Sequence, residues 1–97
     1  MFRHVVVLRW ADDAPPARRA AAVEALRRLG AELADFAHMS VGTDAGLAEG
    51  NADIAVVVDV ADRDAYARYA ADPRHVAVIA EYLRPILAER VAVQYEY

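Results

Sequence analysis

Three side chains in this sequence carry groups suited to proton transfer: His4, Tyr69 and His75. His4 lies in an apolar segment at the start of the chain, and the other two stand on either side of Ala70-Ala71-Asp72-Pro73-Arg74. Histidine titrates near neutral pH, so a neutral imidazole is able to accept a proton. A tyrosine hydroxyl is able to polarise a carbonyl group or to steady an enolate. Together these residue types suit abstraction of a proton from the carbon next to a carbonyl group.

His4 belongs to residues 2–10, a segment rich in β-branched and aromatic residues that predicts a strand. Side chains two residues apart in a strand point to the same side. The residues that share a side with His4 are Val6, Leu8 and Trp10. If that side faces the inside of a barrel, these three residues line an apolar cavity around the imidazole. Burial there lowers the pKa of the imidazole and favours its neutral form.

His75 and Tyr69 are separated by a predicted helix break at Asp72-Pro73. Proline suits the first turn of a helix, so His75 is expected in the first turn of a new helix, where the helix dipole also favours the neutral ring. We expect both side chains to converge on one cavity. A structural role stays open, because a buried histidine that bonds to a tyrosine or to a backbone carbonyl needs no catalytic function.

The chain predicts an α+β domain that spans residues 1–97. Strands are expected at 2–10, 36–43, 54–60 and 90–97, and helices at 16–33, 63–71 and 73–87, the last of them kinked by Pro85. The order β-α-β-β-α-β is the split arrangement of ferredoxin-like domains, with a four-stranded antiparallel sheet. The predicted strand at residues 36–43 is weaker and more polar than the first and third strands, which suits a position at the edge of the sheet.

The first and third strands have apolar residues on both sides, which suits the two central positions of that sheet. Val5 and Val7 on one strand, and Ala55 and Val57 on the other, form a second apolar face. The helices can cover only one face, so the second face needs another layer. A second copy of the chain is the simplest source of that layer, and we expect a homodimer.

Composition narrows the range of functions. Apolar residues make up 58% of the chain, above the roughly 45–50% of soluble domains, which also favours a partner surface. The net charge of −4 argues against binding to nucleic acid. There is no cysteine, and His4, His38 and His75 lack metal-ligand spacing, so neither a metal nor a cofactor is expected. The apolar run Val5–Leu8 is too short for a signal peptide or a membrane span, so we expect a cytoplasmic protein.

The chain resembles the stress-responsive dimeric α/β barrel (Dabb) family over nearly its whole length. The resemblance is carried by Phe2–Leu8, by Tyr69-x-x-Asp72-Pro73-x-His75, by Tyr82–Pro85 and by Glu89–Tyr95. It implies that two ferredoxin-like sheets close into a barrel across a two-fold axis.

The same resemblance implies roles for the three proton-transfer residues. In the plant polyketide cyclase of this family that makes olivetolic acid, the matching positions are catalytic, which implies that His75 and Tyr69 form the catalytic pair and that His4 contributes to the pocket. Relatives often carry an aromatic residue just before the third strand, where this chain has Ala52. If that side chain borders the cavity, its loss widens the mouth.

The expected function is binding of a small carbonyl-containing or polyketide-like molecule in an apolar cavity. As an enzyme, the protein would catalyse cofactor-free cyclisation by intramolecular aldol condensation, with His75 as base, Tyr69 holding the carbonyl oxygen and His4 orienting the substrate. Two alternatives stay open. One is a non-catalytic, stress-associated dimer or ligand-binding protein, and the other is a cofactor-free monooxygenase of the same architecture.

Overall fold

The computed structural model describes residues 1–97, which form four strands and three α-helices. In chain order these are β1 (Phe2–Trp10), α1 (Pro16–Glu32), β2 (Ala37–Thr43), β3 (Ile54–Val60), α2 (Arg63–Ala71), α3 (Pro73–Val78) and β4 (Leu87–Glu96). All strand pairs are antiparallel, in the order β2-β3-β1-β4. The ferredoxin-like prediction is confirmed, with β1 and β3 central and the polar strand β2 at an edge.

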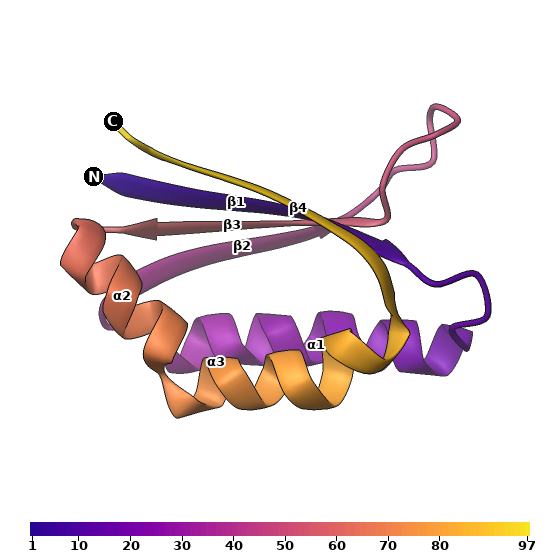
Figure 1. The fold of residues 1–97 in the computed structure, drawn as a ribbon, viewed down its shortest axis with the longest axis horizontal. Helices are drawn as coiled ribbons and strands as arrows, with labels where there is room; N and C mark the ends of the chain where they lie inside the picture. The colour runs from indigo at the N-terminus through magenta and orange to yellow at the C-terminus, as the bar shows by residue number, and fades with distance from the viewer.

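The helices cover one face of the sheet and leave the other bare (Figure 1). The core lies between the two layers, where His4, Val6, Leu8 and Trp10 are all buried beneath the sheet. Leu29 and Leu33 meet them from the helix layer, at 1% and 0% exposure. Burying one such side chain contributes about 1.5–3 kcal/mol.

Gly30 lets helix α1 approach the edge strand β2 closely. A Cβ atom added at Gly30 would lie 3.1 Å from the Cβ atom of Met39, tighter than an ordinary van der Waals contact. The glycine in the last turn of α1 therefore marks a close packing contact between the helix and β2.

The last helical segment differs from its predicted form. The α-helix was expected to run from Pro73 to about Leu87, but it ends at Val78 and continues as a π-helical turn, Ile79–Leu83, and a 3₁₀ turn, Arg84–Ile86. Proline has no N–H to give to the preceding turn, so Pro85 interrupts regular helical bonding. The N–H of Arg84 instead donates to the carbonyl of Ile79, five residues back.

Strand β4 also begins earlier than its predicted start at Arg90. It starts at Leu87, because Leu87 and Glu89 pair with Trp10 and Arg9 of β1 across an irregularity in the register. This pairing joins segments nearly 80 positions apart in sequence. The other predicted boundaries differ from the structure by at most one residue.

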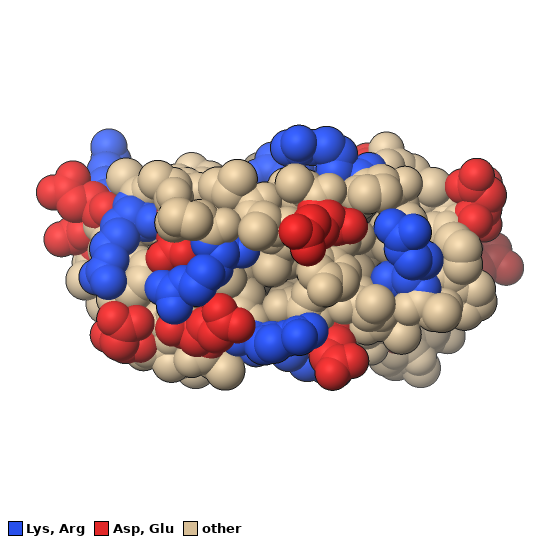
Figure 2. Space-filling view, turned by 90° about the horizontal axis from the view of Figure 1, so that it is seen from below, with Lys and Arg blue, Asp and Glu red and all other residues tan.

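The uncovered face of the sheet is apolar at its centre. We call this surface the open face and define it by Val5, Val7, Ala55, Val57, Val91 and Val93. Val91 and Val93 are 56% and 58% exposed. The helix-covered side is different, because charges of both signs are spread over it (Figure 2). None of the helices combines the length and the apolar character needed to cross a membrane.

Candidate active site

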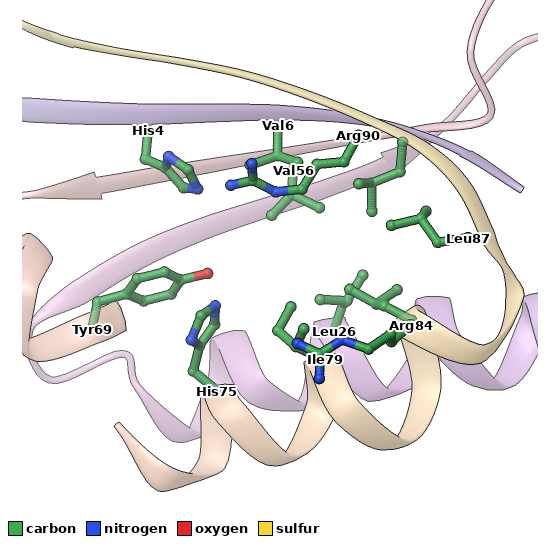
Figure 3. Close-up of a pocket in the computed structure, with 12 residues that line it drawn as sticks. His4, Val6, Leu26, Val56, Tyr69, His75, Ile79, Arg84, Leu87 and Arg90 are labelled. Atoms are coloured by element: carbon green, nitrogen blue, oxygen red, sulfur yellow. The ribbon is translucent and has the colours of Figure 1, made fainter. Parts of the chain in front are cut away.

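A cavity of about 280 Å³ lies between the sheet and the helices. Its walls come from β1, β3, β4, α1, α2, α3 and the turns that follow α3 (Figure 3). The lining residues are His4, Val6, Leu8, Leu26, Val56, Tyr69, His75, Ile79, Leu83, Arg84, Leu87 and Arg90. The volume is just below the roughly 300–1,000 Å³ common for ligand pockets, so the cavity suits a small molecule.

The cavity brings His4, Tyr69 and His75 together. The expectation that the His4 side of the first strand faces the inside of a barrel is wrong, because a barrel formed by two sheets would enclose the opposite side of the sheet. These residues face the helices of the same chain, while the open face points away from them. Of the three apolar residues expected beside His4, Val6 and Leu8 line the cavity, and Trp10 is buried outside it. Ala52 does not border the cavity either, because it lies at a shallow depression over the other side of the sheet, beside Val7.

The break between α2 and α3 positions His75. Asp72 ends α2 and caps α3, since its Oδ1 atom accepts from the N–H of Arg74 at 2.9 Å, and Pro73 opens the new helix. The guanidinium of Arg74 also binds the Asp72 carboxylate at 2.9 Å. This corner places His75 so that its Nδ1 atom lies 3.1 Å from the carbonyl oxygen of Ala70.

That contact determines which nitrogen of His75 is free. A carbonyl oxygen only accepts, so Nδ1 carries the proton and Nε2 keeps its lone pair. Burial lowers the pKa of His75 below its ordinary value, the carbonyl of Ala70 and the charge of Asp72 oppose this shift, and the charge of Arg90 adds to it. The ring is therefore neutral at pH 7, with Nε2 available as a base.

Tyr69 supplies a protonated hydroxyl to the same cavity. The residue lies in the last turn of α2 and is 4% exposed, with its ring centroid 4.4 Å from that of His75. Burial raises the pKa of Tyr69 to about 12, and the neighbouring Tyr66 adds to the rise. The hydroxyl points into the cavity without a hydrogen bond to another protein group (Figure 3). It is therefore free to donate to a ligand oxygen.

His4 is held by Gln94 on the adjacent strand. The two residues are directly opposite in the β1–β4 register, and the Gln94 amide nitrogen lies 3.0 Å from Nδ1 of His4. The same amide donates to the hydroxyl of Tyr66 at 2.9 Å. Because an amide nitrogen only donates, Nδ1 of His4 accepts and Nε2 carries the proton. Burial lowers the pKa of His4 to about 4, aided by the charges of Arg90 and His75. His4 is thus a neutral donor rather than a second base.

This pKa predicts an acid-sensitive fold whose sensitivity falls in the variant His4→Leu. Between pH 6.5 and about 4 the unfolded chain binds a proton at His4 that the folded chain does not, so stability drops as the pH falls through this window. The full drop corresponds to about 3 kcal/mol. Denaturant unfolding of both proteins from pH 7 to pH 4 should show a shallower slope for His4→Leu.

The matched control for this measurement is His38→Gln, since His38 is exposed on β2, and it should keep the wild-type slope. At pH 7 the free energy of unfolding of His4→Leu should change by less than about 2 kcal/mol, the scale of one buried hydrogen bond. A larger loss at pH 7 with an unchanged acid slope would assign His4 a purely structural role.

Two polar residues of β4 were missed by sequence reasoning. Arg90 lines the cavity and Gln94 holds His4, and both lie on the helix-facing side of the sheet. The signal was present in the alternation of the strand: Val91, Val93 and Tyr95 point to the other side, which leaves polar residues where a core strand places apolar ones. Arg84, on the 3₁₀ turn, also lines the cavity and was missed.

Comparisons with known proteins bear on the whole chain. The sequence model of the family described as "Stress responsive A/B Barrel Domain" matches residues 2–97. No curated protein matches. Among solved structures, a dimeric ferredoxin-like protein from Thermobifida fusca is 38% identical, with a TM-score of 0.89 over 99% of this chain and 90% of that one.

Two further solved structures are more distant. A dimeric ferredoxin-like protein from Bacteroides fragilis is 26% identical, with a TM-score of 0.82 over 99% of this chain and 95% of that one. A hydroxynitrile lyase from Passiflora edulis is 16% identical, with a TM-score of 0.80 over 97% of this chain and 90% of that one. The likeness to the lyase shows a shared fold.

Proposed function

This chain belongs to the stress responsive A/B barrel domain family, and on that premise we propose a homodimer that binds small carbonyl compounds and removes an α-proton from them without a cofactor. The observation that carries the proposal is the pairing of opposite hydrogen-bonding states in one cavity. Nε2 of His75 is a free acceptor, and the hydroxyl of Tyr69 is a free donor on a ring whose centroid lies 4.4 Å away. A base beside a donor is what enolate formation needs.

The chemistry divides between these groups. Nε2 of His75 takes the α-proton, the electron pair of the C–H bond forms the C=C bond of the enolate, and the π pair of the carbonyl moves onto its oxygen. The Tyr69 hydroxyl donates to that oxygen and holds the charge that develops there. The N–H at Nε2 of His4 is the second donor in the cavity. The enolate carbon then attacks a second carbonyl of the same molecule to form a carbon–carbon bond. The new alkoxide takes the proton back from His75, which completes an intramolecular aldol cyclisation.

The homodimer rests on the open face. The row Val93, Val5 and Val57 crosses three adjacent strands and has no covering layer within the chain. The solved relatives from Thermobifida fusca and Bacteroides fragilis are described as dimeric. A second sheet on this face would leave the cavity intact, because the cavity lies on the opposite side of the sheet.

Deuterium exchange into the methyl group of acetophenone tests the proposed proton chemistry. The protein-dependent rate in D₂O should rise with pH through a midpoint below 6.5, the ordinary value for histidine, because the pKa of His75 is lowered. It should then stay level to about pH 10, because Tyr69, with a pKa of about 12, keeps its proton. The rate is read by proton NMR and corrected for exchange in buffer alone.

Binding of acetophenone without protein-dependent exchange at any pH would overturn the enzymatic proposal and leave a ligand-binding protein. Consumption of dissolved oxygen during turnover of a ketone would instead support a monooxygenase. An oxygen electrode run beside the NMR assay separates these outcomes.

A further inference from the structure

The mouth of the cavity is marked by two arginines. Among the lining residues only Arg84 and Arg90 are exposed, while His75, Ile79 and Leu87 are half-buried and the others are buried. Arg90 comes from β4, opposite Leu8 in the register and on the helix-facing side. Its guanidinium reaches from this edge strand into the cavity (Figure 3). Any ligand that fills the cavity therefore lies against a cation at its open end.

Neither of these arginines has a protein partner for its charge. The ion pairs of the structure engage other arginines, namely Arg3, Arg9, Arg63, Arg68 and Arg74. The cavity lining contains no Asp or Glu. Asp72, the carboxylate that acts on His75, is already bound by Arg74. The positive charge at the mouth is thus uncompensated within the chain.

The rest of the lining is apolar apart from His4, Tyr69 and His75, so no group within it neutralises the two guanidinium groups. A guanidinium binds a carboxylate through two parallel N–H···O bonds, which gives both affinity and orientation. The small volume of about 280 Å³ suits a compact carboxylate with a short apolar body. The other polar groups of the lining are on His4, Tyr69 and His75, none of which is exposed.

From these observations we infer that the ligand of this cavity is an anionic carbonyl compound, an oxo-carboxylate, whose carboxylate is held at the mouth by Arg90. The inference rests on the proposed function, because it names the substrate class of the same site. Arg90 orients the molecule so that its carbonyl group enters toward Tyr69 and His75. Arg84 adds positive charge beside it and is the secondary group.

Binding of phenylglyoxylate tests the inference. This keto acid has no α-hydrogen, so it binds without exchange, and its amide, phenylglyoxylamide, is a neutral isostere. By titration calorimetry at constant ionic strength, the full-length protein should bind the acid at least about tenfold more tightly than the amide, the usual effect of a charge-assisted hydrogen bond. Arg90→Gln should remove this preference, because it should weaken binding of the acid and leave binding of the amide unchanged. Arg90→Lys should restore part of the preference.

Two matched arginine variants serve as controls. Arg84→Gln should weaken binding of the acid less than Arg90→Gln does. Arg18→Gln makes the same change of charge on the exposed surface of α1 and should leave binding unchanged. Equal binding of acid and amide by the wild type, or an equal loss in Arg18→Gln, would overturn the inference. A larger loss in Arg84→Gln would overturn the assignment to Arg90.

Inorganic phosphate forms a further arm of the test, because a guanidinium also binds phosphate. At equal ionic strength phosphate should compete with phenylglyoxylate no better than chloride does, because it has no apolar body to fill the cavity. Strong competition by phosphate would overturn the choice of a carboxylate. Failure here is distinguishable from failure of the proposed function, because acetophenone is neutral. If the protein catalyses exchange into acetophenone but does not prefer the carboxylate, only the inference about Arg90 is wrong. If it prefers the carboxylate but catalyses no exchange, only the proposed proton chemistry is wrong.

Discussion

Replacing His75 by alanine is expected to lower the protein-dependent exchange of the acetophenone methyl protons by a hundredfold or more, which is the usual contribution of a general base. The reason is that His75 is the one imidazole in the cavity whose inward nitrogen is unprotonated, because its Nδ1–H is engaged by the carbonyl of Ala70. The fold should survive, since the residue is only half-buried on a short helix. The measurement is the exchange rate by NMR, with circular dichroism to verify folding.

Tyr69→Phe completes this experiment, because it keeps the ring that packs on His75 and removes only the hydroxyl. The rate should fall while the free energy of unfolding stays close to that of the wild type, since the hydroxyl has no protein partner. The double variant should lose less than the sum of the two single losses, because a site without its base gains little from a partner for the oxyanion. If His75→Ala exchanged the methyl protons at the wild-type rate, His75 would have no part in the mechanism.

Val93→Glu is expected to convert the protein from a dimer to a folded monomer at micromolar concentration. Val93 is 58% exposed in the single chain and lies in the row with Val5 and Val57 across the open face. Burying the open face against a second copy is worth several kcal/mol at about 25 cal/mol per Å² of apolar area. A glutamate there would place charges from both copies in the interface. Sedimentation should show a species of twice 10.6 kDa for the wild type and of 10.6 kDa for the variant.

The matched control for this prediction is Val76→Glu. Val76 is 52% exposed, close to the value for Val93, but it lies on α3 at the opposite side of the molecule. The control should remain dimeric. A wild-type protein that sediments as a folded monomer would contradict the dimer outright, and dissociation of both variants would show that any added charge disrupts the assembly.

The local elements of the fold follow from local sequence signals. The alternation and β-branching of residues 2–10 and 54–60 predict β1 and β3 with their observed ends, and Asp72-Pro73 predicts the start of α3. These signals act within one turn of a helix or one strand, so no distant contact is needed to interpret them. The order of the elements and the apolar pattern on both sides of the central strands then predict the topology.

The side of the sheet on which the cavity lies was decided by the tertiary structure. The sequence pairs His4 with Val6, Leu8 and Trp10 on one side of a strand, but only the packing of α1 and α3 shows that this side faces the helices of the same chain. Sequence periodicity defines two faces and does not say which layer covers each. The choice depends on which apolar face the helices bury, and that is a long-range property.

The chain by itself determined which residues are available for the proposed proton transfer, whereas their protonation states and the charge beside them came only from the folded structure. The carbonyl of Ala70 and the amide of Gln94 select opposite tautomers of His75 and His4, and these contacts depend on backbone geometry and strand register. Arg90 joins the site because β4 pairs with β1 over more than 80 residues of separation. Hydrogen bonds and the electrostatic effect of a charge depend on distances in space. Residue types and local spacing therefore cannot specify these interactions before the strands and helices have packed together.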